Sequence, residues 1–325
     1  MDNWLFGFIQ SIIDGLATGS IYAMIALGYT LVYGIIKLIN FAHGEFYMFG
    51  AYIGMFILAT PLAATPSVAL FVVVLLAAFL ASGIGAAGLA VITERIAYRP
   101  IRNFDRLSAL LTAIGASFFL QSVAKLAFSP DPQSYRVFEN RMDSPWYQFK
   151  DWYHSYSFPT IPILGIEVEL QHAKVIITLT MMLTMIILYF LVMRTRMGKA
   201  MRATSQDLEA AKLMGINTDA VIAKTFALGG FFAGITGMLV GMLRIVDPMM
   251  GFRPGLKAFV AAVVGGIGSI PGAVLGGLSI GLAENLAVFA NLNTAYRDAV
   301  AFGLLVLILL FRPGGIMGVE RKEKV

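Results

Sequence analysis

The chain has no cysteine among its 325 residues, and few of its residues carry a charge. Without cysteine, neither a disulfide framework nor a cysteine-based metal site can form. Charged residues make up 13% of the chain, whereas soluble domains contain about a quarter. Since 58% of the residues are hydrophobic, the composition predicts an integral membrane protein rather than a soluble one.

The sequence also lacks the motifs that ATP hydrolysis and metal chemistry require. It contains no G-x-x-x-x-G-K-[ST] loop, the motif whose backbone and lysine bind nucleotide phosphates. The glycine-rich run 265–272 lacks that lysine and contains Pro271, so we expect it to mark close packing around a helix break. His43, His154 and His172 are not paired at metal-ligand spacing. We therefore expect no enzyme activity, no catalytic residue, no metal site and no cofactor in this chain.

Three long stretches hold no charged side chain, and they lie at 68–92, 175–193 and 299–311. About 20 apolar residues in a helix cross a hydrocarbon core of roughly 30 Å. Only helices satisfy their own backbone hydrogen bonds in lipid within one segment. The sequence therefore predicts an all-α, polytopic helical bundle that forms a single transmembrane domain over residues 1–325.

Several of the expected spans are short or interrupted. Residues 46–60 are apolar but short for a span, and the break at 265–272 separates the apolar stretches 258–264 and 273–290. Such segments are typical of the discontinuous helices of transporters. Counting them, we expect about eight or nine transmembrane helices. The stretch 4–36 is long and contains several glycines, which favours a helix in the interior of the bundle.

The distribution of charge predicts which loops face the cytoplasm. Basic residues gather at 93–106, in 194–224 and in the tail from Arg312, and cytoplasmic loops collect lysine and arginine. The polar stretch 129–172 instead holds six acidic and three basic residues, so we expect it outside. The C-terminus is then cytoplasmic. Because the basic residues lie in short loops, the net charge of +5 does not indicate a nucleic-acid partner.

The basic segment 194–224 contains the signals of a short helix outside the membrane. Thr204 followed by Asp207 resembles a capping box, and Asp207 suits the positive end of a helix dipole. Gly215 is placed to end the helix.

This short helix would carry a narrow face of small and apolar residues, formed by Leu208, Ala211 and Gly215. Such a face has to be buried, either on the chain's own bundle or in the groove of a soluble partner. We favour docking in a partner, by analogy with other helices that lie in grooves.

Polar residues beside apolar segments form a second candidate site. Asn40, His43 and Glu45 precede a short apolar stretch, and Glu284 lies within another. Ionisable groups at membrane depth are costly and mark substrate paths. The alternative for the first three is an ordinary loop satisfied by water, and the alternative for Glu284 is a structural hydrogen bond.

Five runs of sequence together resemble the LivH family, the permease subunits of bacterial high-affinity branched-chain amino-acid ABC importers. They lie at 19–34, 39–45, 94–100, 196–219 and 257–273. The second run reads INFAHGE and the third reads ERIAYRP. The resemblance extends from about residue 8 to about residue 318, and it is weakest at 129–172.

The resemblance implies a multi-subunit importer in the bacterial inner membrane. A second permease subunit like LivM would pair with this chain. Two cytoplasmic ATPases like LivG and LivF would bind the ATP. A periplasmic binding protein would deliver leucine, isoleucine or valine, with 129–172 on the periplasmic side. The part of 194–224 that would couple transport to the ATPases contains Gly198, Arg202, Asp207, Leu208, Ala211 and Gly215.

Two alternatives stay open. Relatives of these permeases also serve urea and other amides or amino acids, so the first alternative is that the substrate is one of these small molecules. A secondary transporter driven by an ion gradient would instead need several carboxylates near the membrane midplane. Only Glu284 qualifies clearly, which argues against that class.

Overall fold

The computed structural model describes residues 2–60, 67–102, 104–135, 145–155, 161–163, 166–168 and 171–318. Its α-helices are α1 (Asp2–Ile36), α2 (His43–Leu58), α3 (Val68–Thr93), α4 (Arg106–Phe128), α5 (Pro145–His154), α6 (His172–Arg194), α7 (Arg196–Gln206), α8 (Leu208–Leu213), α9 (Thr218–Gly241), α10 (Phe252–Gly265), α11 (Ile270–Phe289) and α12 (Arg297–Phe311). A π-helical turn, η2 (Glu94–Tyr98), extends α3, and a 3₁₀ turn, η3 (Thr294–Tyr296), precedes α12. Two short strands, β1 (Ile161–Ile163) and β2 (Ile166–Val168), pair antiparallel.

Seven helices of the described part are long and apolar enough to cross a membrane, namely α1, α3, α4, α6, α9, α11 and α12. The buried helices α2 and α10 have 16 and 14 residues. At 1.5 Å per residue these are about 24 Å and 21 Å long, and neither can cross a core of roughly 30 Å alone. The predicted polytopic all-α bundle is confirmed. Seven described helices are long enough to span, fewer than the eight or nine that we expected, because α2 and α10 are too short to cross alone.

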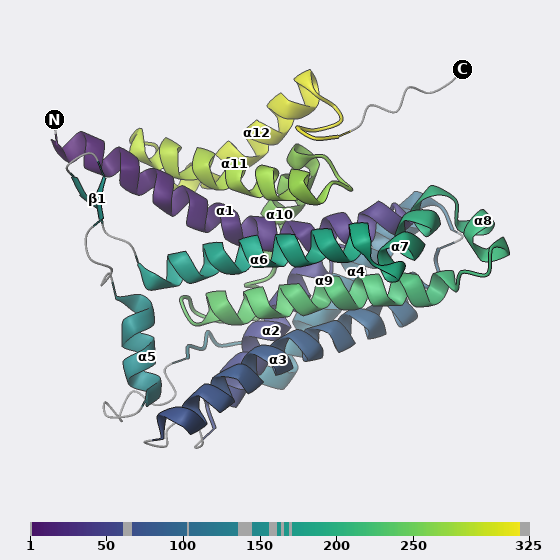
Figure 1. The fold of residues 1–325 in the computed structure, drawn as a ribbon, viewed down its shortest axis with the longest axis horizontal. Coiled ribbons are helices and arrows are strands. Elements are labelled where there is room, and N and C mark those ends of the chain that lie inside the picture. The colour runs from purple at the N-terminus through teal and green to yellow at the C-terminus, as the bar shows by residue number, and fades with distance from the viewer. Residues whose placement is uncertain are drawn as a thin grey trace.

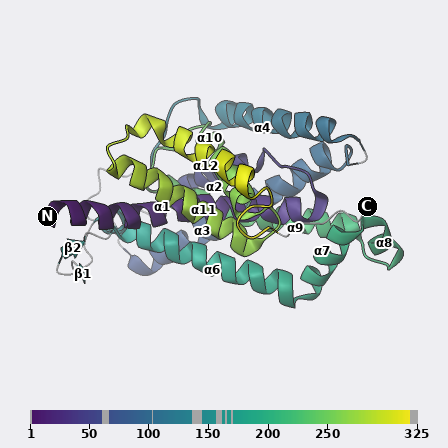
Figure 2. The same ribbon diagram turned by 90° about the horizontal axis from the view of Figure 1, so that it is seen from above.

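The long helices divide into an interior set and a peripheral set. Most of α1 and α9 is buried, whereas α3, α4, α6 and α12 expose valine, leucine and phenylalanine side chains along much of their length. In Figure 1, α1 lies between α11 and α6, and Figure 2 shows α4 and α6 on opposite flanks of the bundle. The interior position expected for 4–36 is thereby confirmed. The exposed flanks are apolar enough to face lipid or another membrane subunit.

The two ends of the bundle carry different segments. The β1–β2 hairpin lies at the end where the chain begins, and α8 lies at the opposite end in both views (Figures 1 and 2). This arrangement agrees with the opposite charge bias of 129–172 and 194–224, which predicts that the two segments face opposite sides of the membrane.

The described parts of 129–172 are more ordered than the loop we expected. They contain α5 and the hairpin, while 136–144, 156–160, 164–165 and 169–170 lie outside the described residues. Phe149 of α5 packs on Phe71 of α3 with ring centroids 5.5 Å apart, and the Tyr153 hydroxyl donates to the Leu239 carbonyl at 3.0 Å. These aromatic contacts explain why a stretch without a long apolar run forms a helix.

The expected glycine-proline break is present between α10 and α11. Gly266 and Gly268 have φ values of 101° and 99°, a region that favours glycine. Ser269 caps α11, because its side chain accepts a hydrogen bond from the backbone of Gly272. On the other side, the backbone of Ile316 and Met317 donates to Val264 and Gly265 at 2.9 and 3.0 Å. The C-terminal tail therefore completes the hydrogen bonding at the end of α10.

Contact between helix backbones holds α1 against α11. A β-carbon at Gly281 would overlap the Gly15 carbonyl oxygen and the Gly19 nitrogen, and one at Gly19 would lie 2.8 Å from the Gly277 carbonyl oxygen. Small residues let membrane helices approach in this way, which increases the van der Waals contact between them.

We expect Gly281→Val to separate α1 from α11 and to destabilise the bundle by about 1–3 kcal/mol or more, as overpacking does. Gly303 of α12 is the matched control, because a β-carbon there has nothing within 4 Å. Thermal unfolding of the purified protein in detergent should show a lower midpoint for Gly281→Val and an unchanged one for Gly303→Val. Equal midpoints for the two variants would contradict this account of the packing.

Candidate functional site

The start of α2 and the residues just before it place three candidate residues inside the bundle. Asn40, His43 and Glu45 are each about 1% exposed. The helix begins at His43, so it includes His43 and Glu45, which we expected to precede the apolar stretch 46–60. The alternative of a water-satisfied loop is wrong for these side chains, because neighbouring helices cover them.

His43 lies deep within the helix packing. Its ring is so close to Gly28 of α1 that a β-carbon there would overlap it, and it lies 3.4 Å from a β-carbon built at Gly229, in the middle of α9. The Tyr29 ring meets it edge-on with centroids 5.0 Å apart. Its Nε2 atom has no hydrogen-bond partner among the described residues.

Asn40 is fixed by a residue far along the chain. The Tyr98 hydroxyl of η2 donates to Asn40 Oδ1 at 2.7 Å, and both side chains are buried. Asn40 Nδ2 has no partner in the described part of the chain. The π-helical turn η2 thus holds the entry to α2.

Glu45 has hydrogen-bond partners on one of its two oxygens. Its Oε1 accepts from the Ser117 hydroxyl at 2.8 Å and from the Gln121 amide at 2.9 Å, both on α4. Its Oε2 has no partner among the described residues. A β-carbon built at Gly251 would lie 3.2 Å from that Oε2 atom, so the unpaired oxygen is directed toward Gly251.

The N-termini of the two short helices meet at this point. A β-carbon on Gly44 of α2 would lie 3.3 Å from the Cα of Gly255 and would overlap the Gly251 carbonyl oxygen at the start of α10. A helix N-terminus carries partial positive charge, which favours a nearby carboxylate in its ionised form. The meeting of α2 and α10 therefore offsets part of the cost of burying the Glu45 carboxylate.

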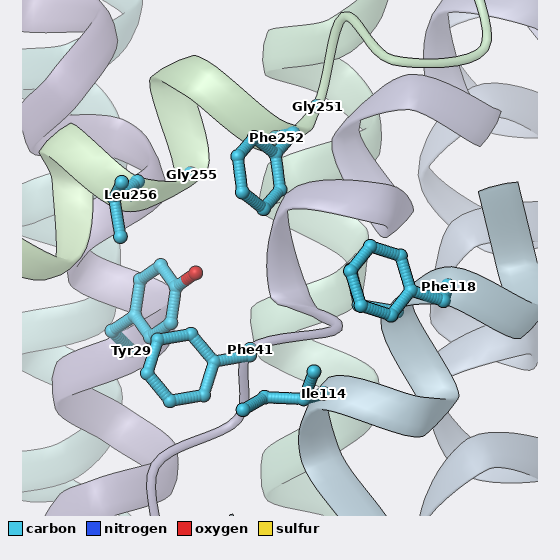
Figure 3. A pocket seen from close by; sticks show the side chains of 9 residues that line it. Tyr29, Phe41, Ile114, Phe118, Gly251, Phe252, Gly255 and Leu256 are labelled. Carbon is cyan, nitrogen blue, oxygen red and sulfur yellow. The ribbon is translucent and has the colours of Figure 1, made fainter.

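A small cavity of about 50 Å³ lies beside this junction. Figure 3 shows the rings of Phe41, Phe118 and Phe252 around it, with the Tyr29 hydroxyl pointing inward. The residues lining it are Tyr29, Phe41, Ile114, Ser117, Phe118, Gly251, Phe252, Gly255 and Leu256. The cavity is therefore mostly apolar, with polar groups at Tyr29 and Ser117.

Glu284 has a different environment. Its Oε1 lies 2.8 Å from Lys257 Nζ, and its Oε2 accepts from the Tyr22 hydroxyl at 3.1 Å. Lys257 Nζ also lies 2.8 Å from Asp298 Oδ1. This network joins α1, α10, α11 and α12, and none of its residues lines the cavity beside Glu45. The arrangement indicates that Glu284 stabilises the packing of these helices, and it argues against a place for Glu284 on the substrate path.

The segment after α6 forms two helices where we expected one. The Asp207 carboxylate caps α8 by accepting from the backbone of Glu209 and Ala210 at 2.9 Å each. The proposed cap at Thr204 is wrong, because Thr204 lies within α7 and its hydroxyl donates to the Ala200 carbonyl at 2.9 Å. The chain leaves the helical conformation after α8 at Gly215, which has a φ of 81°.

Local hydrogen bonds also build α7. Thr195 caps it by accepting from the Gly198 backbone at 3.1 Å, and the Arg202 guanidinium donates to the Val192 carbonyl at the end of α6. Gly198 is buried so tightly that a β-carbon there would overlap the carbonyls of Leu191 and Val192. Gly198 and Arg202 thus set the turn between α6 and α7.

The docking face that we expected on this segment is wrong in part. Ala211 is buried within the chain and Leu208 is half-buried, because a helix of six residues packs its inner side on the bundle. Leu213 and Met214, just before Gly215, are 87% and 82% exposed. Their exposure could have been predicted from the sequence, because they are a pair of apolar residues directly before a helix-ending glycine.

A charged cluster anchors the neighbouring helix end. Asp219, in the first turn of α9, pairs with Arg99 and with Arg102, and Arg102 also pairs with the buried Glu94. Burial lowers the pKa of the Arg102 guanidinium, and the adjacent Asp219 carboxylate opposes that shift. The basic residues of 93–106 therefore do more than indicate the cytoplasmic side of the membrane. Their ion pairs also hold η2 against α9.

We expect Tyr98→Phe to leave the buried Asn40 side chain without a partner, at a cost of about 1–3 kcal/mol. Tyr296→Phe is the control, because Tyr296 is 58% exposed. Chemical denaturation in detergent should separate the two variants. An unchanged midpoint for Tyr98→Phe would show that this hydrogen bond does not stabilise the start of α2.

Comparison with known proteins gives matches over the whole chain. A family model described as the permease component of branched-chain amino acid transport systems matches residues 11–309. The chain is 42% identical over 327 residues to the high-affinity branched-chain amino acid permease protein LivH of Salmonella typhimurium, covering all of both chains. It is 42% identical over 329 residues to LivH of Escherichia coli K12, again covering both chains. It is 41% identical over 324 residues to BraD of Pseudomonas aeruginosa, covering 99% of each.

Proposed function

Because the chain belongs to the family of permease components of branched-chain amino acid transport systems, we propose that it forms the path by which an ABC importer carries leucine, isoleucine and valine across the bacterial inner membrane. The single observation that carries this proposal is the 42% identity to LivH along the full length of both chains. The seven long helices supply the membrane domain that such a subunit requires. Permease subunits are not themselves enzymes, and the sequence has no phosphate-binding loop.

The partners in this proposal are a second permease subunit like LivM, two cytoplasmic ATPases like LivG and LivF, and a periplasmic binding protein. The ATPases bind the ATP, so this chain needs no cofactor of its own. The apolar outer sides of α4 and α12 offer surface for a second membrane subunit. Charge bias supports a cytoplasmic position for α7, α8 and the C-terminus, and a periplasmic position for α5 and the hairpin.

We place the docking of the ATPase on the tip formed by α7 and α8. Leu213 and Met214 are the apolar side chains that this tip exposes, and a short apolar protrusion suits a groove in a soluble partner. Gly198, Arg202, Asp207 and Gly215 shape the tip through the caps and turns described above, while Leu208 and Ala211 pack it on the bundle.

We place the substrate path beside the junction of α2 and α10. Asn40, His43 and Glu45 are buried there with polar atoms that have no partner among the described residues. Buried polar atoms without partners are uncommon and costly, and in membrane helices such groups face ligand paths.

The energy source separates this proposal from ion-coupled transport. Cells that express the complete importer should lose leucine uptake when ATP is depleted while the ion gradient across the membrane is kept intact. Isoleucine and valine should compete with leucine, and urea should not. Uptake that survives ATP depletion would contradict the ABC importer, and competition by urea would instead favour the amide alternative.

The double variant Leu213→Asp with Met214→Asp tests the docking tip. We expect at least a 10-fold loss of both ATPases from the affinity-purified permease, because buried apolar anchors typically contribute about 2 kcal/mol or more at interfaces. The second permease subunit should still co-purify. Met317→Asp changes another exposed methionine and serves as the control. Full recovery of the ATPases with the double variant would show that Leu213 and Met214 do not contribute to the interface.

A further inference from the structure

We propose that the Glu45 carboxylate accepts the α-ammonium group of the transported amino acid, and that the adjacent cavity takes the substrate's apolar side chain. This inference rests on the proposed function for the identity of the substrate. It adds a binding role for a particular atom, Glu45 Oε2, and a reason for the choice of an amino acid with an apolar side chain.

Glu45 stands apart from the other buried glutamates of the described residues. Glu94 pairs with Arg102, and Glu284 pairs with Lys257. No basic side chain of the described part pairs with Glu45, and its Oε2 has no hydrogen-bond partner. A buried carboxylate is costly unless it is paired. An ammonium ion from outside the chain would satisfy Glu45, the one buried carboxylate of the described residues that has no cation beside it.

Glu45 does not itself line the cavity, but two residues that line it lie against the Glu45 carboxylate. Ser117 lines the cavity and donates to Oε1, and Gly251 lines the cavity next to Oε2. At Gly251 and Gly255 the wall is backbone without side chains. A primary ammonium group has three donors. Oε2 is buried behind Gly251 in this conformation, so the ammonium group reaches it when α2 and α10 separate at this junction.

The cavity suits an aliphatic group. Phe41, Ile114, Phe118, Phe252 and Leu256 supply an apolar lining. An apolar lining of this kind suits a branched aliphatic side chain such as the isobutyl group of leucine.

The opposing interpretation is that Glu45 only fastens α4 to α2. Ser117 and Gln121 both bond to Oε1, and Glu45→Gln keeps an oxygen that can accept from both. The variant therefore preserves the fastening and removes the negative charge. A purely structural role predicts that wild type and Glu45→Gln carry leucine equally well.

Because this chain has no cysteine, an introduced thiol is the only one on this subunit, and its labelling can be measured on this subunit of the purified importer. Phe118→Cys places a thiol in the cavity, and Phe119→Cys places one on the next residue of α4, which does not line it. Each thiol is labelled with cationic 2-aminoethyl methanethiosulfonate and with anionic 2-sulfonatoethyl methanethiosulfonate. We expect Glu45→Gln to lower the ratio of cationic to anionic labelling rate at least 5-fold at position 118 and to leave it unchanged at 119. An unchanged ratio at 118 would overturn the proposal.

Ligand protection tests the amino-acid part. Leucine should slow the labelling of Phe118→Cys, and 2-hydroxy-4-methylpentanoate, which has a hydroxyl in place of the ammonium group, should not. Equal protection by both compounds would overturn the role of Glu45 in ammonium binding.

Transport by the reconstituted importer separates the two proposals. If the wild-type importer carries no leucine in liposomes with its binding protein and ATP, the proposed function fails, while the labelling ratio still decides whether the cavity selects cations. If wild type and Glu45→Gln carry leucine equally well, the inference alone fails.

Discussion

Direct contact between helix backbones is the constraint on which the rest of the structure depends. Gly281 of α11 meets the backbone of α1, and Gly234 and Gly237 bring α9 against the backbones of α3 and α2. In lipid the hydrophobic effect does not drive helices together, so close packing supplies much of the attraction. The frame built by α1, α9 and α11 holds α2 and α10 inside the bundle although both are too short to cross a membrane. Their N-termini can therefore meet beside a buried carboxylate.

Much of the fold could be predicted from the sequence, because its signals are local. Uncharged runs of sufficient length gave the long helices, and the glycine-proline run 265–272 gave the break between α10 and α11. The same local reasoning failed where two signals lay close together. Thr204 and Asp207 are both good capping residues, and the backbone geometry of the turn after α7, rather than residue type, decides that Asp207 is the cap. The helix α5 was missed because aromatic contacts with distant helices stabilise it.

Only the residues at the start of α2 could be predicted from the sequence as part of the candidate site. Asn40, His43 and Glu45 could be selected because polar residues are rare beside apolar stretches, and the structure does bring them together. Their partners could not be selected, since Tyr98 and Ser117 belong to other helices and nothing in their local sequence distinguishes them. Glu284 is a similar case. Its burial was expected, but its partner Lys257 lies on another helix and could not be predicted from the sequence near Glu284. The role of all four residues in transport stays a prediction.

The bonds from the C-terminal tail to α10 have a consequence for biosynthesis. The carbonyl groups of Val264 and Gly265 accept from Ile316 and Met317, and the last carbonyls of a helix otherwise have no partner in their own helix. During translation α10 leaves the ribosome long before residues 316 and 317. The end of α10 therefore acquires its final hydrogen bonds only after α11, α12 and residues 316 and 317 have been synthesised, so closure of this part of the bundle follows the synthesis of all the described helices.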